Sequence, residues 1–179
     1  MDTAFCVFDT AIGTCGIAWH GGTIAGVQLP EGDEARTRER MQRRFPGATE
    51  APPPPDVAAI ARRMRRSLQG EPDAMLDVPL DLEAIAPFQR RVYEVTRAIA
   101  PGRTLTYGEV AAAIGEPGAA RAVGQALGHN PFAPIVPCHR VLAARSGAGG
   151  FSADGGVVTK LRLLELEQAR FGAEPGLFD

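Results

Sequence analysis

The apolar residues of the first 30 positions occur in short runs separated by turn-forming residues. These runs cover residues 5–8, 15–19 and 24–29, and the pair Gly21-Gly22 separates the last two. Short apolar runs joined by a glycine turn are typical of antiparallel strands. The pattern therefore predicts a small antiparallel meander at the start of the chain.

Helical spacing then replaces the strand pattern. Residues 33–44 are rich in charged, helix-forming side chains, and the proline run 52–55 predicts an extended loop. Apolar side chains next recur with helical spacing at Val57, Ile60, Met64 and Leu68. We expect a helix there, followed by an extended connection over residues 77–87. A domain boundary in that connection divides the chain into residues 1–85 and 86–179.

The second domain is mainly helical in pattern. Apolar spacing predicts one helix over residues 88–99. Thr106 and Glu109 have the spacing of a capping box, which predicts a helix over residues 107–114. A Gly/Pro turn leads to a second short helix over residues 119–127. Two short helices joined in this way outline a helix-turn-helix, although any small helical hairpin has the same outline.

The second of these short helices carries almost no bulky side chains. Its small residues are Ala119, Ala120, Ala122, Gly124 and Ala126. Only Arg121 and Gln125 are long and polar, whereas a helix that reads base edges in the major groove needs several such side chains. The helix is therefore suited to close approach to a DNA backbone or groove, or to close packing against another helix.

Composition and charge narrow the class of protein. The chain is 45% hydrophobic and 22% charged, which is typical of globular proteins. It has no apolar run near the roughly 20 residues that span a bilayer, and its start lacks the features of a signal peptide. We therefore expect a cytoplasmic protein without a membrane segment. The net charge of −2 is uneven, because residues 86–145 carry seven arginines against three glutamates. This basic region is compatible with nucleic-acid binding, although arginines on solvated helix faces would give the same count.

The three cysteines favour thiol chemistry over disulfide formation. Cys6, Cys15 and Cys138 are an odd number, and disulfides are rare in the cytoplasm. Cys6, Cys15 and His20 do not have the spacing of a standard zinc site, so we expect no metal. Cys138 precedes His139, and an adjacent imidazole favours the reactive thiolate. A lone Cys-His pair is nevertheless more often structural.

Several segments around Cys138 form an ordered series that favours the chemical interpretation. They are residues 106–107, 120–124, 130–131, 137–141, 150–152 and 163–167, with Pro-Cys-His-Arg at the core. In these segments the chain resembles the O6-alkylguanine-DNA alkyltransferases, also called methylated-DNA–protein-cysteine methyltransferases. The resemblance implies an α+β fold. It consists of a small N-terminal antiparallel-sheet domain, RNase H-like, and a helical C-terminal domain with a helix-turn-helix and an active-site cysteine.

The resemblance also implies catalytic roles. Cys138 matches the alkyl acceptor, and His139 matches the residue that takes the thiol proton through a water. Glu167 matches the carboxylate that orients this histidine. Asn130 matches the asparagine that braces the active-site turn behind the DNA-binding helix. Tyr107 matches the tyrosine whose hydroxyl meets guanine N3 and aids departure of the base.

The same resemblance implies the contacts with DNA and with the base. Arg121 matches the arginine that enters the duplex and fills the space left by the flipped nucleotide. The other residues expected at the DNA are Ala120, Ala122, Gly124, Tyr107 and Arg140. The residues expected around the base are Val141, Phe151, Ser152 and Leu127. The Ser152 amide is expected to face O6, and the carbonyls of Cys138 and Val141 to accept from the guanine amino group.

The chain departs from the family pattern in one wall of the base pocket. Phe151 stands where a tyrosine is usual, and the loop segments 145–147 and 152–156 differ in length. The range of tolerated alkyl groups therefore stays open, and the zinc-binding members of the family are not matched. We expect His129 at the surface or at a hinge. Lys160 is expected either at the DNA or near Glu167.

The implied reaction is direct reversal of DNA alkylation. An alkyl group, in the simplest case methyl, passes from O6 of a flipped guanine, or from O4 of an alkylated thymine, to Cys138. The product is a thioether without an easily displaced leaving group, so we expect one turnover per molecule and no cofactor. The expected partner is double-stranded DNA carrying an alkylated base, bound through its minor groove by a monomeric protein.

Three other functions are compatible with parts of the pattern. A non-catalytic lesion-binding protein of the same fold is disfavoured because such proteins replace the acceptor cysteine. A helix-turn-helix regulator that senses through Cys138 is disfavoured by the Ala/Gly-rich second helix. A cysteine hydrolase is disfavoured because adjacent residues such as Cys138 and His139 rarely orient as a nucleophile–base pair.

Overall fold

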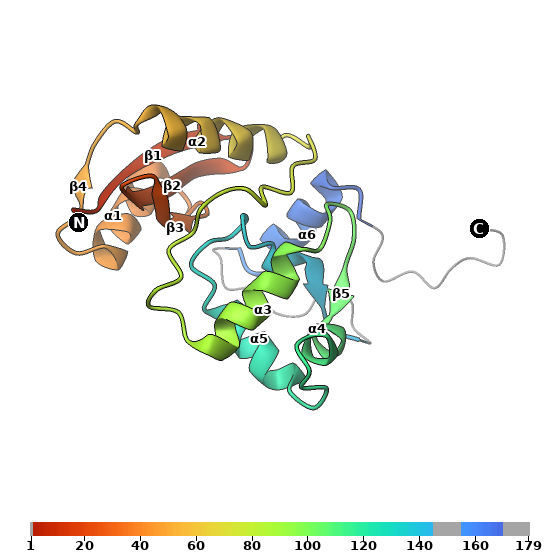
Figure 1. Ribbon diagram of the computed structural model, residues 1–179. Helices are drawn as coiled ribbons and strands as arrows, with labels where there is room; N and C mark the ends of the chain where they lie inside the picture. The colour runs from red at the N-terminus through yellow and green to blue at the C-terminus, as the bar shows by residue number, and fades with distance from the viewer. Residues whose placement is uncertain (1, 145–154, 170–179) are drawn as a thin grey trace.

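The computed structural model describes residues 2–144 and 155–169 (Figure 1). Its first half is built on a sheet of strands β1 (Ala4–Thr10), β2 (Gly13–His20), β3 (Thr23–Gln28) and β4 (Thr49–Glu50). The strand order is β3-β2-β1-β4, with antiparallel pairing throughout β1, β2 and β3. The predicted meander is therefore confirmed. The parallel strand β4 was not predicted, since its two residues are exposed and form no apolar run.

Two helices cover opposite faces of this sheet (Figure 1). Helix α1 (Glu34–Arg44) begins at Asp33, whose side chain accepts from the Arg36 amide. Its buried Met41 packs with Phe5 and Ala18 on one face. Close approach is possible because Gly16 lies below Met41, where an added Cβ would come within 2.6 Å of the Met41 side chain.

Helix α2 (Pro55–Ser67) covers the other face, as its predicted apolar spacing requires. Its first residue, Pro55, lies at a position where the missing N–H costs no helical hydrogen bond. The buried Val57, Ile60 and Met64 join Phe8 of β1 in the main core. The predicted extended loop over residues 52–55 therefore includes one residue too many, because its last proline, Pro55, is already the first residue of the helix.

The described residues of the second half form four α-helices and a short parallel ladder. The helices are α3 (Pro87–Arg97), α4 (Tyr107–Ala113), α5 (Ala120–Gly128) and α6 (Val157–Leu166). The ladder pairs β5 (Leu105–Thr106) with β6 (Val141–Leu142), and the 3₁₀ turn η1 (Cys138–Arg140) precedes β6. The predicted capping box is confirmed, because Thr106 and Glu109 accept each other's backbone N–H groups.

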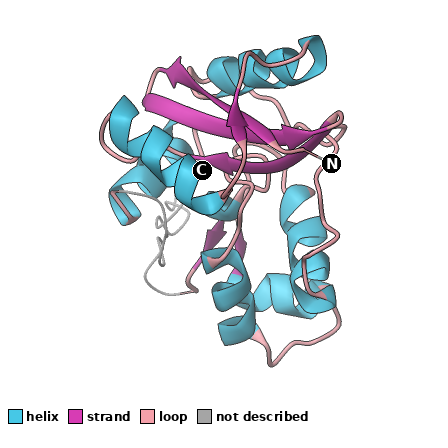
Figure 2. Cartoon of the chain, turned by 90° about the vertical axis from the view of Figure 1, so that its left-hand side faces the viewer, coloured by secondary structure: helices cyan, strands magenta, loops and turns pink. Residues whose placement is uncertain are grey.

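The two halves share one hydrophobic core. In Figures 1 and 2 the sheet lies above helices α3, α4 and α5, with the β5–β6 ladder inside the helical half. Buried residues from both halves belong to the same cluster, among them Ile17, Met64, Val92, Val123 and Cys138. The architecture is α+β, as expected. Within the described ranges no helix is long and apolar enough to cross a bilayer.

Candidate active site

The nucleophile candidate Cys138 lies at the start of η1, with 6% of its surface exposed. The parallel ladder pairs Leu105 with Val141 and Thr106 with Leu142. It therefore joins the start of α4, where Tyr107 lies, to the chain that follows Cys138. Burial raises the pKa of the Tyr107 hydroxyl, and the charge of the Cys138 thiolate raises it further. The ladder thus brings the predicted tyrosine and the predicted acceptor cysteine within electrostatic reach.

Asn130 ties the end of α5 to the segment before the cysteine. Its amide nitrogen donates to the Val136 carbonyl at 2.8 Å, and its amide oxygen accepts from the Phe132 backbone at 3.0 Å. Burial raises the pKa of the Cys138 thiol, whereas a hydrogen bond with Asn130 and the charge of Lys160 oppose this shift. Asn130 therefore both fixes the turn and favours the thiolate.

His139 forms a buried pair with Glu167. The His139 Nε2 atom lies 2.8 Å from Glu167 Oε1, and the histidine is only 2% exposed. Arg140 donates to the same carboxylate through Nε at 3.0 Å and through Nη2 at 2.7 Å. Burial acts to raise the pKa of Glu167, but the hydrogen bonds from His139 and Arg140 outweigh it and lower that pKa to about 2. The carboxylate is therefore ionised at neutral pH.

The ionised carboxylate fixes the tautomer of the histidine. Burial lowers the pKa of His139 below its ordinary value, although Glu167 opposes this shift, so the ring is neutral. A neutral ring that donates from Nε2 to a carboxylate carries its lone pair on Nδ1. Nδ1 is buried and has no hydrogen-bond partner among the described residues. It is therefore available as a base.

Arg140 does not lie where the sequence analysis put it. The side chain is 3% exposed, and besides Glu167 it donates to the Ile99 carbonyl at 2.6 Å. The prediction that Arg140 contacts DNA is therefore wrong, because a guanidinium buried against a carboxylate cannot reach a phosphate. Its role is to neutralise Glu167 inside the protein.

Comparison with known proteins identifies the family to which this site belongs. Residues 87–169 match the family model described as "6-O-methylguanine DNA methyltransferase, DNA binding domain". The methylated-DNA–protein-cysteine methyltransferase of Mycobacterium leprae is 49% identical over 172 residues, 96% of either chain. The crystal structure of the Mycobacterium tuberculosis O6-methylguanine methyltransferase is similar with a TM-score of 0.75 at 36% identity, over 99% of each chain. The structure of the Mycobacterium tuberculosis protein OGT in complex with DNA matches with a TM-score of 0.73 at 38% identity, over 92% of each chain.

This chain belongs to the methylated-DNA–protein-cysteine methyltransferase family. The resemblance inferred from the motif series is thereby confirmed, and it extends beyond the C-terminal half, since the relatives align over nearly the whole chain. The family model begins at residue 87. The domain boundary near residue 85 nevertheless stays a prediction, because the hydrophobic core is continuous across it.

Helix α5, which was predicted to approach the DNA, has one buried and one exposed face. Arg121 and Gln125 are exposed, whereas Val123, Ala126 and Leu127 are buried. The small residues Ala120, Ala122 and Gly124 are partly buried. An added Cβ at Gly124 would lie 3.8 Å from the Tyr107 ring, so the helix runs directly over that tyrosine.

The predicted base pocket is described only in part. Val141 and Leu127 are buried at 0% and 4% exposure, and Phe151 and Ser152 lie outside the described residues. A cavity of about 310 Å³ reaches Cys138, and residues of the first half line much of it. Among them Arg44 donates to the carbonyls of Val27 and Pro131, at 2.7 and 3.1 Å. None of these first-half residues was predicted at the site from the sequence.

Lys160 was expected at the DNA or near Glu167, and the structure places it inside the site. It is completely buried, and its ammonium donates to the Val141 carbonyl at 2.6 Å and to the Tyr107 hydroxyl at 3.4 Å. Burial lowers the pKa of Lys160 to about 8, although the charge of Cys138 opposes this shift. The sequence offered one signal for this site: Lys160 is the only lysine of the chain and stands among apolar residues.

Possible metal ligands do not assemble in the described part of the chain. No group of three or more His, Cys, Asp or Glu side chains there could hold an ion. His20 instead lies 2.9 Å from Asp81, and Cys6 and Cys15 are free thiols.

Replacing Lys160 by methionine should slow reaction at Cys138. The positive charge lowers the pKa of the thiol, so its loss should reduce the thiolate fraction and slow alkyl transfer by about three- to tenfold. Because the pKa of Lys160 is about 8, wild-type and variant rates should converge as the pH rises above that value. Single-turnover rates measured across this range test the prediction, with Arg162→Met as the control on the exposed face of α6. A constant ratio of the two rates at all pH values would contradict it.

Proposed function

We propose that this protein repairs DNA by transferring an alkyl group from O6 of guanine to the sulfur of Cys138. The observation that carries the proposal is the buried hydrogen-bonded pair next to the cysteine, in which ionised Glu167 holds neutral His139 in place. An alkyl group on O4 of thymine presents the same kind of C–O bond and is a second candidate substrate.

The proposed reaction is a single displacement at the alkyl carbon. The thiol proton passes through a water to His139, whose imidazolium form Glu167 stabilises. The sulfur attacks the alkyl carbon, a C–S bond forms, and the C–O bond breaks with its electrons leaving on the base. Tyr107, placed beneath α5, donates a hydrogen bond to the departing guanine. The proton lost by the thiol finally resides on the guanine, so the displaced base leaves neutral. The thioether is stable, so each molecule reacts once.

We further propose that α4 and α5 act as a helix-turn-helix that binds the minor groove. The exposed Arg121 and the small residues around it support this proposal, because a helix without bulk can approach the duplex closely. Arg121 then fills the space of the flipped nucleotide and offsets part of the few kcal/mol that unstacking costs. By the same resemblance the first half is RNase H-like and the protein is a monomer. A reduced nucleophilic thiol also fits the cytoplasm.

The decisive experiment measures covalent transfer. Purified protein is incubated with duplex DNA containing one O6-methylguanine, and the mass of the intact protein and of its peptides is determined. A gain of one methyl group on Cys138, saturating at one per molecule while guanine is restored, supports the proposal. Tight lesion binding without a gain in mass would support the alternative, a non-catalytic lesion-binding protein of the same fold.

A further inference from the structure

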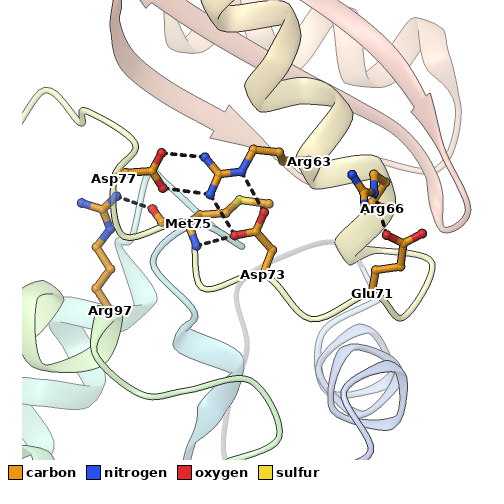
Figure 3. Close-up of polar contacts among 7 residues, drawn as sticks. All are labelled: Arg63, Arg66, Glu71, Asp73, Met75, Asp77 and Arg97. Carbon is orange, nitrogen blue, oxygen red and sulfur yellow. Dashed lines mark hydrogen bonds and ion pairs between the residues drawn. The ribbon is translucent and has the colours of Figure 1, made fainter.

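The connection between the two halves is held by one arginine and two aspartates (Figure 3). Arg63 of α2 donates to both carboxylate oxygens of Asp73, at 2.7 and 2.9 Å. It also donates to both oxygens of Asp77, each at 2.8 Å. The planar guanidinium thus uses its three nitrogen atoms on two carboxylates, a set of bonds that a lysine cannot reproduce.

The cluster fixes the backbone of Met75, which lies between the two aspartates. The Met75 amide donates to Asp73 Oδ1 at 2.9 Å, and its carbonyl accepts from Arg97 of α3 at 2.7 Å. Met75 has a φ of +47°, in the left-handed region that costs a residue other than glycine about 1 kcal/mol. Bonds from both halves therefore hold Met75 in a conformation that it would rarely adopt alone.

Met75 and the proton-transfer residues line one small cavity. The Met75 side chain is 3% exposed and, together with Asp73 and Leu68, lines a cavity of about 10 Å³. His139 and Glu167 line the same cavity. The space accommodates about one water molecule. The connection thus forms part of the wall of a cavity that the His139–Glu167 pair also lines.

We propose that Arg63 is a positioning residue for proton transfer, because it fixes Asp73 and Met75 in the wall of the cavity beside His139 and so keeps bulk water from that ring. The inference rests on the proposed alkyl transfer. It gives the N-terminal half a defined role in the reaction, although none of its residues matches the family's catalytic motif.

Loss of Arg63 should change the charge and the solvation around His139 together. The charged and titratable groups around this ring are Lys160 of α6 and Glu167 at its C-terminal end, Cys138 and Arg140 of η1, and Asp73 of the connection. Without Arg63, the carboxylates of Asp73 and Asp77 lose their counter-ion and the wall loosens. Added negative charge and added water both favour the imidazolium, so His139 would stay protonated to a higher pH.

The test compares Arg63→Gln with Arg66→Gln, one turn further along the same helix. Arg66 makes an ion pair with Glu71, but both side chains are more than half exposed and neither lines the cavity (Figure 3). Methyl transfer from O6-methylguanine duplex is measured under single-turnover conditions as a function of pH. We expect Arg63→Gln to slow transfer at neutral pH by about tenfold and to move the acidic limb of the profile to higher pH. Arg66→Gln should match the wild type.

A second variant separates positioning from folding. Met75→Ala keeps the arginine–aspartate cluster but opens the wall, so it should shift the acidic limb in the same direction. A lower thermal midpoint in both variants with unchanged pH profiles would overturn the proposal, as would equal rates for Arg63→Gln and Arg66→Gln. If the wild type itself transfers no methyl group, the proposed alkyl transfer is wrong. That outcome differs from one in which the wild type is active and Arg63→Gln behaves like Arg66→Gln, which would reject only the role of Arg63.

Discussion

Serine in place of Cys138 should leave the protein folded and able to bind lesion-containing DNA, but unable to accept the alkyl group. A hydroxyl is far less acidic than a thiol, and the site, which already raises the pKa of the thiol by burial, cannot generate an alkoxide. We expect the transfer rate to fall by at least about 10⁴-fold. Intact-protein mass after incubation with O6-methylguanine duplex measures the loss, and a gel-shift titration measures the retained binding.

Cys6→Ser is the matched control for this experiment. Cys6 is a half-buried thiol of β1, and burial raises its pKa to about 11, with the charge of Glu50 contributing. It should not react at neutral pH, so its replacement should leave the gain in mass unchanged. A methyl group that maps to Cys6 or Cys15 in the Cys138→Ser variant would contradict the assignment of the acceptor.

Glutamine in place of Glu167 should have the second largest effect, on both stability and rate. The substitution leaves Arg140 buried at 3% exposure without its counter-ion, which typically costs about 3–5 kcal/mol. A neutral amide also stabilises the His139 imidazolium poorly, so alkyl transfer should slow by about 10²-fold. Urea unfolding and single-turnover kinetics measure the two losses.

The difference in stability should depend on pH with a defined sign. The pKa of Glu167 is lowered from 4.5 to about 2 in the folded protein. The ionised form therefore contributes stability that is fully present above its ordinary pKa and is lost as the pH falls from about 4.5 toward 2. The gap between wild type and Glu167→Gln should shrink over this window.

Glu165→Gln provides the control on the same helix. Glu165 is exposed, and an exposed substitution away from special contacts usually changes stability by less than about 0.5 kcal/mol. If the Glu167→Gln variant were as stable as this control at neutral pH, the buried cluster would not hold the site together as described.

The catalytic half of the site could largely be predicted from the sequence. The Pro-Cys-His-Arg core and the distant Glu167 matched a family series, and the structure brings His139 and Glu167 together at 2.8 Å. The capping box of Thr106 and Glu109 fixed the start of α4, because its hydrogen bonds join residues only three apart. Such local or motif-borne signals do not depend on knowledge of the tertiary packing.

The contacts of buried charged residues could not be predicted in this way. Arg140 was expected at the DNA and lies against Glu167, 27 positions away. For Lys160 the sequence left two positions open and gave no sign of its bond to the Tyr107 hydroxyl, 53 positions away. Whether a cation faces solvent or a buried carboxylate depends on which distant segment covers it, and a hydrophobicity pattern contains no such information.

The sequence by itself thus determined the class of most elements, the capping box of α4 and the candidate acceptor cysteine, because periodicity, capping and motif chemistry are local properties. The tertiary structure alone decided that Arg140 and Lys160 are buried, that Arg44 reaches Pro131, and that Met75 lines a cavity together with His139 and Glu167. The reason is physical: burial and ion pairing are set by the free energy of the assembled core, in which segments distant in sequence exclude water together.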